Sequence, residues 1–274
     1  MNVLITGAGG QLGRALMARA PAEATVRGVS HEQLDIADRL AVDSVLAEFP
    51  PDVLINAAGF TRVDDAETEH EAAERANASG PAVLAGACRR LGAWLLQVST
   101  DYVFDGAQSR PYAPAAPTNP LSVYGRTKRQ GELAVERELP SQSTVLRTSW
   151  VYAAEGRNFL TTMLRLMGSR PKLSIVSDQI GAPTSVTGLA QVLWALARRK
   201  APGLPNVPAD FRAAPRWRGG NRRLPRRFRE IAGDGHNSTH ERGSLGALSS
   251  HDVPPNSAHR RNTTTRSQIQ MPCS

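Results

Sequence analysis

The stretch VLITGAGGQLG, residues 3–13, decides the fold of this chain. VLIT has the composition of a buried strand, and a glycine loop follows it directly, before a helix that we expect to begin at Gln11. The first glycine of the loop, Gly7, permits a tight turn. Gly10 lets backbone approach a pyrophosphate, and Gly13 lets helix and strand pack closely. Because such a unit presents its helix N-terminus to phosphates, the stretch predicts a dinucleotide-binding α/β fold.

Short apolar runs alternate with helix-like segments from residue 1 to about residue 200. The expected strands, most of them bounded by turn residues, cover 3–6, 25–30, 52–58, 94–100, 144–151 and 172–178. The expected helices cover 11–19, 38–48, 67–90, 122–138, 157–168 and 185–199. This alternation predicts a Rossmann-type, doubly wound, mostly parallel sheet with helices on both faces. We expect residues 1–200 to form one NAD(P)-binding domain with the catalytic residues.

The last 74 residues differ from the rest in charge and composition. Residues 1–200 hold 21 Lys and Arg against 20 Asp and Glu, whereas 201–274 hold 12 Arg and no Lys against 5 Asp and Glu. Leu, Ile, Val and Phe make up only 10 of these 74 residues. We therefore expect a basic, disordered tail without a domain of its own. Its arginines lack regularly spaced aromatic neighbours, so we expect no nucleic-acid partner despite the charge.

Cysteine usage and the N-terminus indicate the compartment. Cys88 and Cys273 lie far apart, without metal-ligand spacing, which favours a reducing environment. The N-terminal MNVLITGAGG has no basic region of the kind that opens a signal peptide. No apolar run approaches the roughly 20 residues of a membrane helix. We expect a cytoplasmic protein with no membrane partner.

Candidate catalytic residues lie at and after the fourth expected strand. Thr100 ends that strand, and NPLSVYGRTK (119–128) places Tyr124 and Lys128 one helical turn apart at the start of a long helix. Carboxyl ends of strands are where open α/β sheets bind ligands. Reduction of a ketone by hydride needs a proton for the forming alkoxide, and a phenol with a pKa of about 10 donates it more usefully when that pKa is lowered. We expect Lys128 to lower the phenol pKa and to bind the nicotinamide ribose, and Thr100 to hold the carbonyl oxygen.

The adenosine end of the cofactor site is less defined. VRGVSHEQ (26–33) has no acidic residue before Glu32, so a 2′-phosphate is not repelled and NADPH is favoured weakly over NADH. Asp35 could lie near the adenine, or equally cap the following helix. The remaining expected contacts are Ile36 beside it and the small residues after the third strand, Ala57, Ala58 and Gly59.

GAGGQLG, NAAGFTRVDDAE, STDYVFDG, PLSVYGRTK, RTSWVY and SDQIGAPT occur in this order within residues 1–200. Together they resemble the dTDP-4-dehydrorhamnose reductase family of extended short-chain dehydrogenases. The resemblance implies reduction of the 4-keto group of dTDP-6-deoxy-L-lyxo-4-hexulose (dTDP-4-dehydrorhamnose) by NADPH or NADH. The product would be dTDP-L-rhamnose, which is used for cell-surface polysaccharides such as O-antigen.

The resemblance also implies residue roles. Thr100, Tyr124 and Lys128 match the catalytic set, Thr100 and Asp101 the substrate-contacting pair, and Trp150 the sugar-contacting tryptophan. The implied cofactor contacts are Gly7, Gly10, Gln11, Leu12, Gly13, Asp35, Ile36, Ala57, Ala58, Gly59, Tyr124 and Lys128.

Several of these motif residues have a plainer structural interpretation. Trp150 could be a core aromatic residue, and Asp101 could cap its turn. The other residues with structural interpretations are Asp64, Asp65 and Glu67, as a capped helix start, and Asp178 and Gln179, as a loop lining the sugar pocket; His31 and His70 have no expected role.

The resemblance ends near Lys200. The W-x-x-F-A and A-R-R-P segments that continue the family's substrate lobe are missing from the sequence, so we expect that lobe to be missing or replaced. A shift of reading frame near codon 200, or true divergence, would explain the change in composition. Ala15 lies where some relatives carry a glutamate that binds magnesium at a dimer interface, so we expect no metal. A homodimer remains an expectation.

Three other functions stay open. Another nucleotide-sugar reductase or an epimerase could use the same Tyr–Lys pair. A non-catalytic, NADP-binding regulatory subunit has this fold but lacks the tryptophan at Trp150, which argues against it. An inactive product without the substrate lobe is the third, since loss of the lobe removes groups that orient the ketone.

Overall fold

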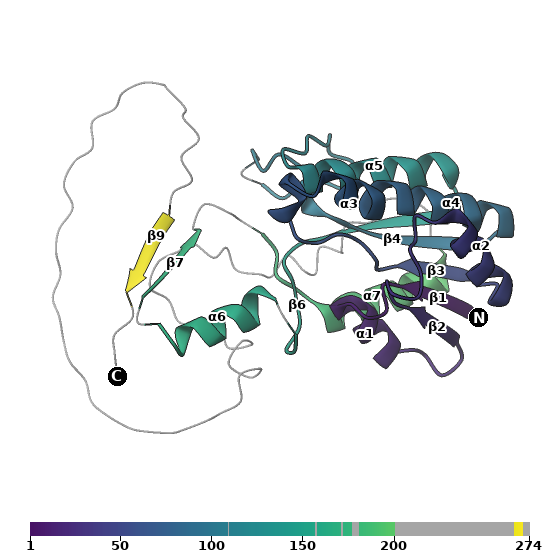
Figure 1. The fold of residues 1–274 in the computed structure, drawn as a ribbon, viewed down its shortest axis with the longest axis horizontal. Coiled ribbons are helices and arrows are strands. Elements are labelled where there is room, and N and C mark those ends of the chain that lie inside the picture. Colours follow the sequence, from purple (N-terminus) through teal and green to yellow (C-terminus); the bar gives the residue numbers. More distant parts are fainter. Residues whose placement is uncertain (109, 157, 171, 177–180, 201–265, 271–274) are drawn as a thin grey trace. The chain divides into compact units, whose positions relative to one another are not determined.

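In a computed structural model, the structure describes residues 1–108, 110–156, 158–170, 172–176, 181–200 and 266–270 (Figure 1). The chain divides into two compact units, residues 1–164 with 181–215 and residues 165–180 with 216–274. The predictions for Asp178 and Gln179, for Cys273 and for most of the tail lie outside the described residues. None of the helices in the described part is long and apolar enough to cross a membrane.

The first unit is built on a parallel sheet with the order β2-β1-β3-β4-β5. Its strands match the predicted ones closely: β1 (Asn2–Thr6), β2 (Thr25–Val29), β3 (Val53–Asn56), β4 (Trp94–Thr100) and β5 (Ser143–Thr148). Every neighbouring pair is parallel. The chain leaves β1 in opposite directions to reach β2 and β3, and such a switch point is where doubly wound sheets bind ligands.

Helices cover both faces of this sheet, which confirms the doubly wound prediction (Figure 1). Alternate residues of one strand serve different cores, as the strand pleat requires. Leu54 belongs to the core formed with α2, α4 and α5, whereas Ile55 belongs to the core formed with α1 and α7, and both are fully buried. The helices are α1 (Gln11–Ala18), α2 (Arg39–Glu48), α4 (Gly80–Leu91), α5 (Val123–Glu138) and α7 (Val186–Arg199).

The single helix predicted over 67–90 is interrupted. It consists of η1 (Asp65–Glu67), α3 (His70–Glu74), the π-helical turn η2 (Arg75–Ser79) and then α4. Pro81 has no amide hydrogen, so it cannot donate to the carbonyl of Asn77, its partner in regular α-helix. Gly80 accordingly donates to the Arg75 carbonyl, five residues back. Such π-turns are frequent at functional sites.

The predicted strand 144–151 also breaks. After β5 the chain turns at Trp150, whose φ of 47° lies in the left-handed region, and continues as β6 (Val151–Tyr152). β6 pairs in parallel with β8 (Thr184–Ser185). Helix α6 (Phe159–Met167) agrees with the prediction.

The second unit contains an antiparallel pair of strands. β7 (Lys172–Val176) pairs with β9 (Arg266–Gln270), from Lys172 opposite Gln270 to Val176 opposite Arg266. Ladder hydrogen bonds come from the backbone and need no apolar pattern, so no pattern in the sequence signals β9; the disorder of the tail stays a prediction. Residues 201–265 and 271–274 lie outside the described part.

Candidate active site

The glycine loop after β1 forms a backbone cradle against the loop after β3. Gly7 has a φ of 69°, and a Cβ there would lie 2.6 Å from the Ala58 nitrogen. A Cβ on Gly13 would lie 2.2 Å from the Gly7 oxygen, so strand and helix approach through bare backbone. Gly10 is the N-cap of α1, and no side chain caps that helix. Uncapped first-turn amides beside a glycine cradle fit a dinucleotide pyrophosphate.

The other cofactor candidates lie around this cradle. Asp35 does not cap α2, which Asp38 does; instead it accepts from the Ala37 amide and pairs with Arg75 at 2.7 Å. Ile36 is buried in the core, so any cofactor contact there must come from its backbone. The remaining candidates lie in the α1 start (Gln11, Leu12) and in the loop after β3 (Ala57, Ala58, Gly59).

A ladder of buried polar groups crosses the sheet near this edge. Thr6 Oγ1 donates to Asn56 Oδ1 at 2.6 Å, and Asn56 Nδ2 donates to Gln97 Oε1 at 2.8 Å. Gln97 Nε2 in turn donates to the Val98 carbonyl at 2.9 Å. Lys128 Nζ donates to the same carbonyl at 2.7 Å. The ladder thereby links three neighbouring strands to the lysine of α5.

The structure brings the three predicted catalytic residues together. Thr100 is at the end of β4, and Tyr124 and Lys128 are on the first turns of α5; all three are buried. Thr100 Oγ1 caps the short turn η3 (Asp101–Val103) by accepting from the Tyr102 amide at 3.2 Å. Burial raises the pKa of Tyr124 to about 12, while a hydrogen bond with Thr100 acts in the opposite direction.

The pKa of the phenol is raised overall and Lys128 is not among the groups that shift it, so a lowering of that pKa by Lys128 stays a prediction. Burial dominates both groups, because removal from water disfavours whichever form is charged. It lowers the pKa of Lys128 itself to about 8, with the negative charge of Glu132 opposing the change. The ammonium faces the Val98 carbonyl, and a Cβ on Gly59 would lie 3.8 Å from Nζ. The Lys128 side chain therefore extends from α5 towards the end of β4 and the loop after β3.

All three predicted sugar contacts, Thr100, Asp101 and Trp150, lie in the first unit. Burial raises the pKa of Asp101 to about 6, and its Oδ1 accepts from Thr100 Oγ1 at 3.2 Å. Asp101 is not the cap of its turn, since Thr100 has that place. Trp150 is 37% exposed rather than a core residue. Its indole covers Gly181, where a Cβ would lie 2.5 Å from the ring.

Two positions near Tyr124 were not predicted. Glu67 Oε1 accepts from the Val123 amide at 2.7 Å, so this acid caps α5 from a distant segment. Asn77 is buried, pairs with both backbone groups of Phe60 and donates to Thr127 Oγ1. The sequence predicts Glu67 only as part of a local helix start, because the residues around it give no signal of a partner 56 residues away.

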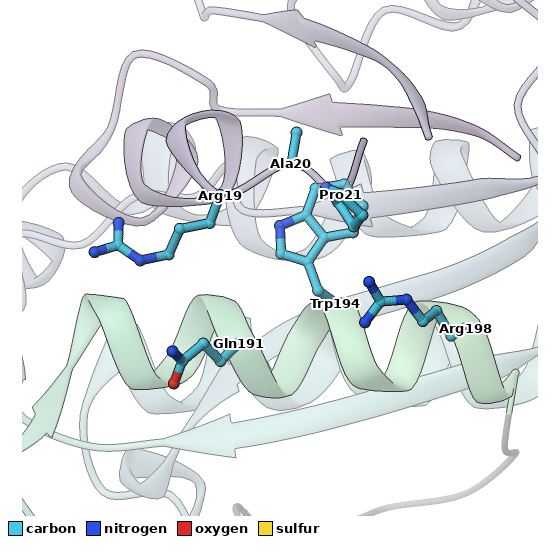
Figure 2. Close-up of a pocket in the computed structure, with 6 residues that line it drawn as sticks. All are labelled: Arg19, Ala20, Pro21, Gln191, Trp194 and Arg198. Atoms are coloured by element: carbon cyan, nitrogen blue, oxygen red, sulfur yellow. The ribbon is translucent and has the colours of Figure 1, made fainter. Parts of the chain in front are cut away.

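A separate hollow of about 400 Å³ lies between the C-terminal end of α1 and helix α7 (Figure 2). It is lined by Arg19, Ala20, Pro21, Gln191, Trp194 and Arg198, none of which is a predicted site residue. Within the described part of the chain, no three His, Cys, Asp or Glu side chains form a metal cluster. The absence of a resident metal stays a prediction.

The glycine cradle and the buried Thr–Tyr–Lys set lie at the same carboxyl edge of a doubly wound sheet. This combination is typical of a Rossmann-type oxidoreductase. Within that class, the chain belongs to the RmlD substrate binding domain family, whose model matches residues 1–206.

Three relatives illustrate the match. The dTDP-4-dehydrorhamnose reductase of Streptomyces griseus is 44% identical over 236 residues, covering 84% of this chain and 76% of that protein. A dTDP-4-keto-6-deoxy-D-glucose reductase of Streptomyces niveus is 44% identical over 203 residues, covering 73% and 70%. The solved structure of dTDP-4-dehydrorhamnose reductase from Bacillus anthracis in complex with NADP superposes with a TM-score of 0.73 at 38% identity, covering 75% of this chain and 73% of that one.

Proposed function

We propose that this chain reduces the 4-keto group of dTDP-4-dehydrorhamnose to give dTDP-L-rhamnose, with NADPH or NADH, in the biosynthesis of cell-surface polysaccharide. The observation that carries the proposal is the buried set of Thr100, Tyr124 and Lys128 at the carboxyl edge of the sheet. Relatives that are 44% identical reduce 4-keto sugars attached to dTDP, as their names state. Residues 1–206, which the family model matches, contain every proposed site residue.

A nicotinamide cofactor, when bound at the glycine cradle, would supply the hydride that reduces C4 of the sugar. The Tyr124 hydroxyl gives its proton to the ketone oxygen, so that the alkoxide becomes the 4-hydroxyl group. Thr100 holds that oxygen from its other side, close enough to the Tyr124 hydroxyl to lower its pKa. The buried ammonium of Lys128 favours the phenolate left behind, as a positive charge nearby lowers a phenol pKa.

The remaining assignments concern binding. Asp101 and Trp150 contact the sugar, Asp101 with a carboxyl held beside Thr100 and Trp150 with a half-exposed ring. Cofactor binding falls to the cradle and its surroundings, namely Gly7, Gly10, Gln11, Leu12, Gly13, Asp35, Ile36, Ala57, Ala58, Gly59, Tyr124 and Lys128. A homodimer in the cytoplasm remains part of the proposal, and sedimentation of the purified chain tests the dimer.

Oxidation of NADPH and NADH in the presence of dTDP-6-deoxy-L-lyxo-4-hexulose tests the function, with Tyr124→Phe as the matched variant. Turnover that falls by about 10²- to 10⁴-fold in the variant, the usual range for a general acid, supports the proposal. Cofactor binding, followed separately by fluorescence, should change much less than turnover, because the other proposed cofactor contacts are kept. Binding without turnover in the natural chain would instead support an inactive or regulatory protein. A product with inverted stereochemistry and no net cofactor oxidation would indicate an epimerase.

A second substrate belongs in the same assay. The Streptomyces niveus relative is named for dTDP-4-keto-6-deoxy-D-glucose, and it is as similar to this chain as the Streptomyces griseus protein. Because the two sugars differ in stereochemistry and share the 4-keto group, the Thr–Tyr–Lys set serves either. A higher kcat/KM for the D-glucose derivative would indicate that the chain is a dTDP-4-keto-6-deoxy-D-glucose reductase instead.

A further inference from the structure

Helix α5 and strand β5 share a buried ion pair that the mechanism above does not use. Glu132 is 1% exposed and Arg147 is 6% exposed. Arg147 Nε donates to Glu132 Oε1 at 2.8 Å, and a terminal nitrogen donates to Oε2 at 2.7 Å. The pair is thus bidentate, which fixes the orientation of both side chains as well as their distance.

A second arginine of α5 joins the pair from the rim. Arg129 donates to Glu132 at 2.9 Å and to Glu136 at 3.1 Å. Its Nε donates to Thr118 Oγ1 at 3.1 Å. Arg129 therefore connects the buried pair to the segment that leads into α5.

The same segment is held by Arg147. Its remaining terminal nitrogen donates to the Pro114 carbonyl at 2.9 Å, and its guanidinium lies 5.1 Å from the centre of the Phe104 ring. Phe104 stacks on Tyr112 with ring centres 4.2 Å apart. Three contacts from two arginines thus reach residues 104–119, whose described part forms no helix or strand.

That stretch, residues 104–119 apart from 109, leaves the site and returns to it. It begins three residues after Asp101 and ends shortly before Ser122, the N-cap of α5. Within it, Tyr112 and Asn119 both donate to Asp105. The arginines therefore connect it to the α5–β5 framework that carries Lys128.

Stability does not account for this arrangement. Apolar residues of similar volume commonly replace a buried ion pair without loss of stability. What apolar residues cannot do is donate to the Pro114 carbonyl and the Thr118 hydroxyl in fixed directions. The retained charges are therefore better explained by orientation of the segment than by its attachment alone.

We propose that Arg147, Glu132 and Arg129 are positioning residues that fix the segment 104–119 beside the catalytic set and thereby determine affinity for the nucleotide sugar. The inference rests on the proposed function. Hydride and proton transfer, and cofactor binding, should change little in Arg129→Gln, which leaves the Glu132 charge that raises the pKa of Lys128 in place.

Arg129→Gln is the first test, because it loses the contact with Thr118 and leaves the buried pair intact. Arg137→Gln is the matched control, since Arg137 lies on the same helix, is exposed, and pairs only with Glu138 among the described residues. We expect the KM for the sugar to rise about tenfold or more in Arg129→Gln, with kcat and the Kd for NADPH within about twofold of the natural chain. The control should match the natural chain.

The double variant Glu132→Leu with Arg147→Met removes the pair without leaving a lone buried charge. We expect it to fold, to show the larger rise in KM, and to exchange the amide hydrogens of 104–119 faster than the natural chain. Exchange in β1 and β3 should not change.

The exchange measurement and calorimetric binding of the dTDP-sugar need no turnover. An inactive natural chain would therefore refute the proposed function while these two readouts still decide the positioning role. Unchanged exchange across 104–119 in both variants would overturn the inference. So would faster exchange with unchanged sugar affinity, or a loss confined to kcat or to NADPH binding.

Discussion

Replacement of Lys128 by methionine should make the protein more stable at neutral pH. The ammonium is buried, and its hydrogen bond to the Val98 carbonyl does not offset the lost hydration, since the pKa of Lys128 falls from 10.5 to about 8. Methionine has a similar length and no charge, so it fills the same space without that cost. The lysine proposed as catalytic is then a source of instability.

The size of the effect follows from the two pKa values. A tenfold change in proton affinity is worth about 1.4 kcal/mol, so a fall from 10.5 to about 8 corresponds to roughly 3 kcal/mol of destabilisation while the lysine is charged. Between pH 8 and 10.5 the unfolded chain binds more protons at this residue than the folded chain. The free energy of unfolding therefore rises with pH in this window, and the penalty disappears near pH 10.5.

Urea unfolding at a series of pH values between 7 and 10.5 measures this. Tyr124 and Cys88 have raised pKa values and lose stability in the alkaline range, but they do so equally in both proteins and cancel in the difference. Lys128→Met should exceed the natural chain by about 1–3 kcal/mol at pH 7, and the gap should close towards pH 10.5. Lys172→Met, at an exposed lysine, is the control and should give no such gap. A variant that is less stable than the natural chain at pH 7, or a gap independent of pH, would refute the reasoning.

Three further changes test other parts of the site. Gly13→Ala puts a methyl group 2.2 Å from the Gly7 oxygen, so the cradle must open; the Kd for NADPH, measured by fluorescence, should rise about tenfold or more. Glu67→Ala removes the acceptor of the Val123 amide; urea unfolding should show a loss of about 1 kcal/mol, and kcat should fall while NADPH binding holds. The pKa of Asp101 is raised to about 6, so the folded chain holds a proton at this residue more tightly than the unfolded chain does. The free energy of unfolding therefore falls as pH rises from about 4 to 6. Asp101→Asn should abolish that fall in thermal unfolding scans.

The sheet and its helices could be predicted because their signals are local. The strands of the five-stranded sheet are mostly apolar runs, most of them bounded by turn residues, and β4, Trp94–Thr100, has the predicted bounds. The glycine spacing predicts the phosphate-binding loop for the same reason. Gly7 and Gly13 lie within seven residues of sequence, and each stands where backbone atoms leave no room for a Cβ. The Tyr–x–x–x–Lys spacing likewise identified one helix face.

Tertiary partners could not be predicted in this way. Glu132 follows Lys128 by one turn and thus shares the buried face of α5, and Arg147 interrupts an apolar strand. Each is a charged residue in a buried position, which signals a partner, but nothing local says that the two meet. Asn77 is similar, because its partners Phe60 and Thr127 become neighbours only when α5 packs on the π-turn.

The direction of the pKa changes at the site could not be read from spacing either, and it alters the chemistry that the site supports. Tyr124, Lys128 and Asp101 are all shifted towards their neutral forms, with burial as the largest cause in each case. A lysine that is only partly charged near pH 8 cannot favour the phenolate as strongly as the spacing alone suggests. Thr100 lowers the pKa of Tyr124 against the effect of burial, and an interaction between polar groups counts for more in such dry surroundings than it would in water. The reductase chemistry proposed here consequently depends on Thr100 and on the Val98 carbonyl that holds Lys128, and not on the Tyr–Lys spacing alone.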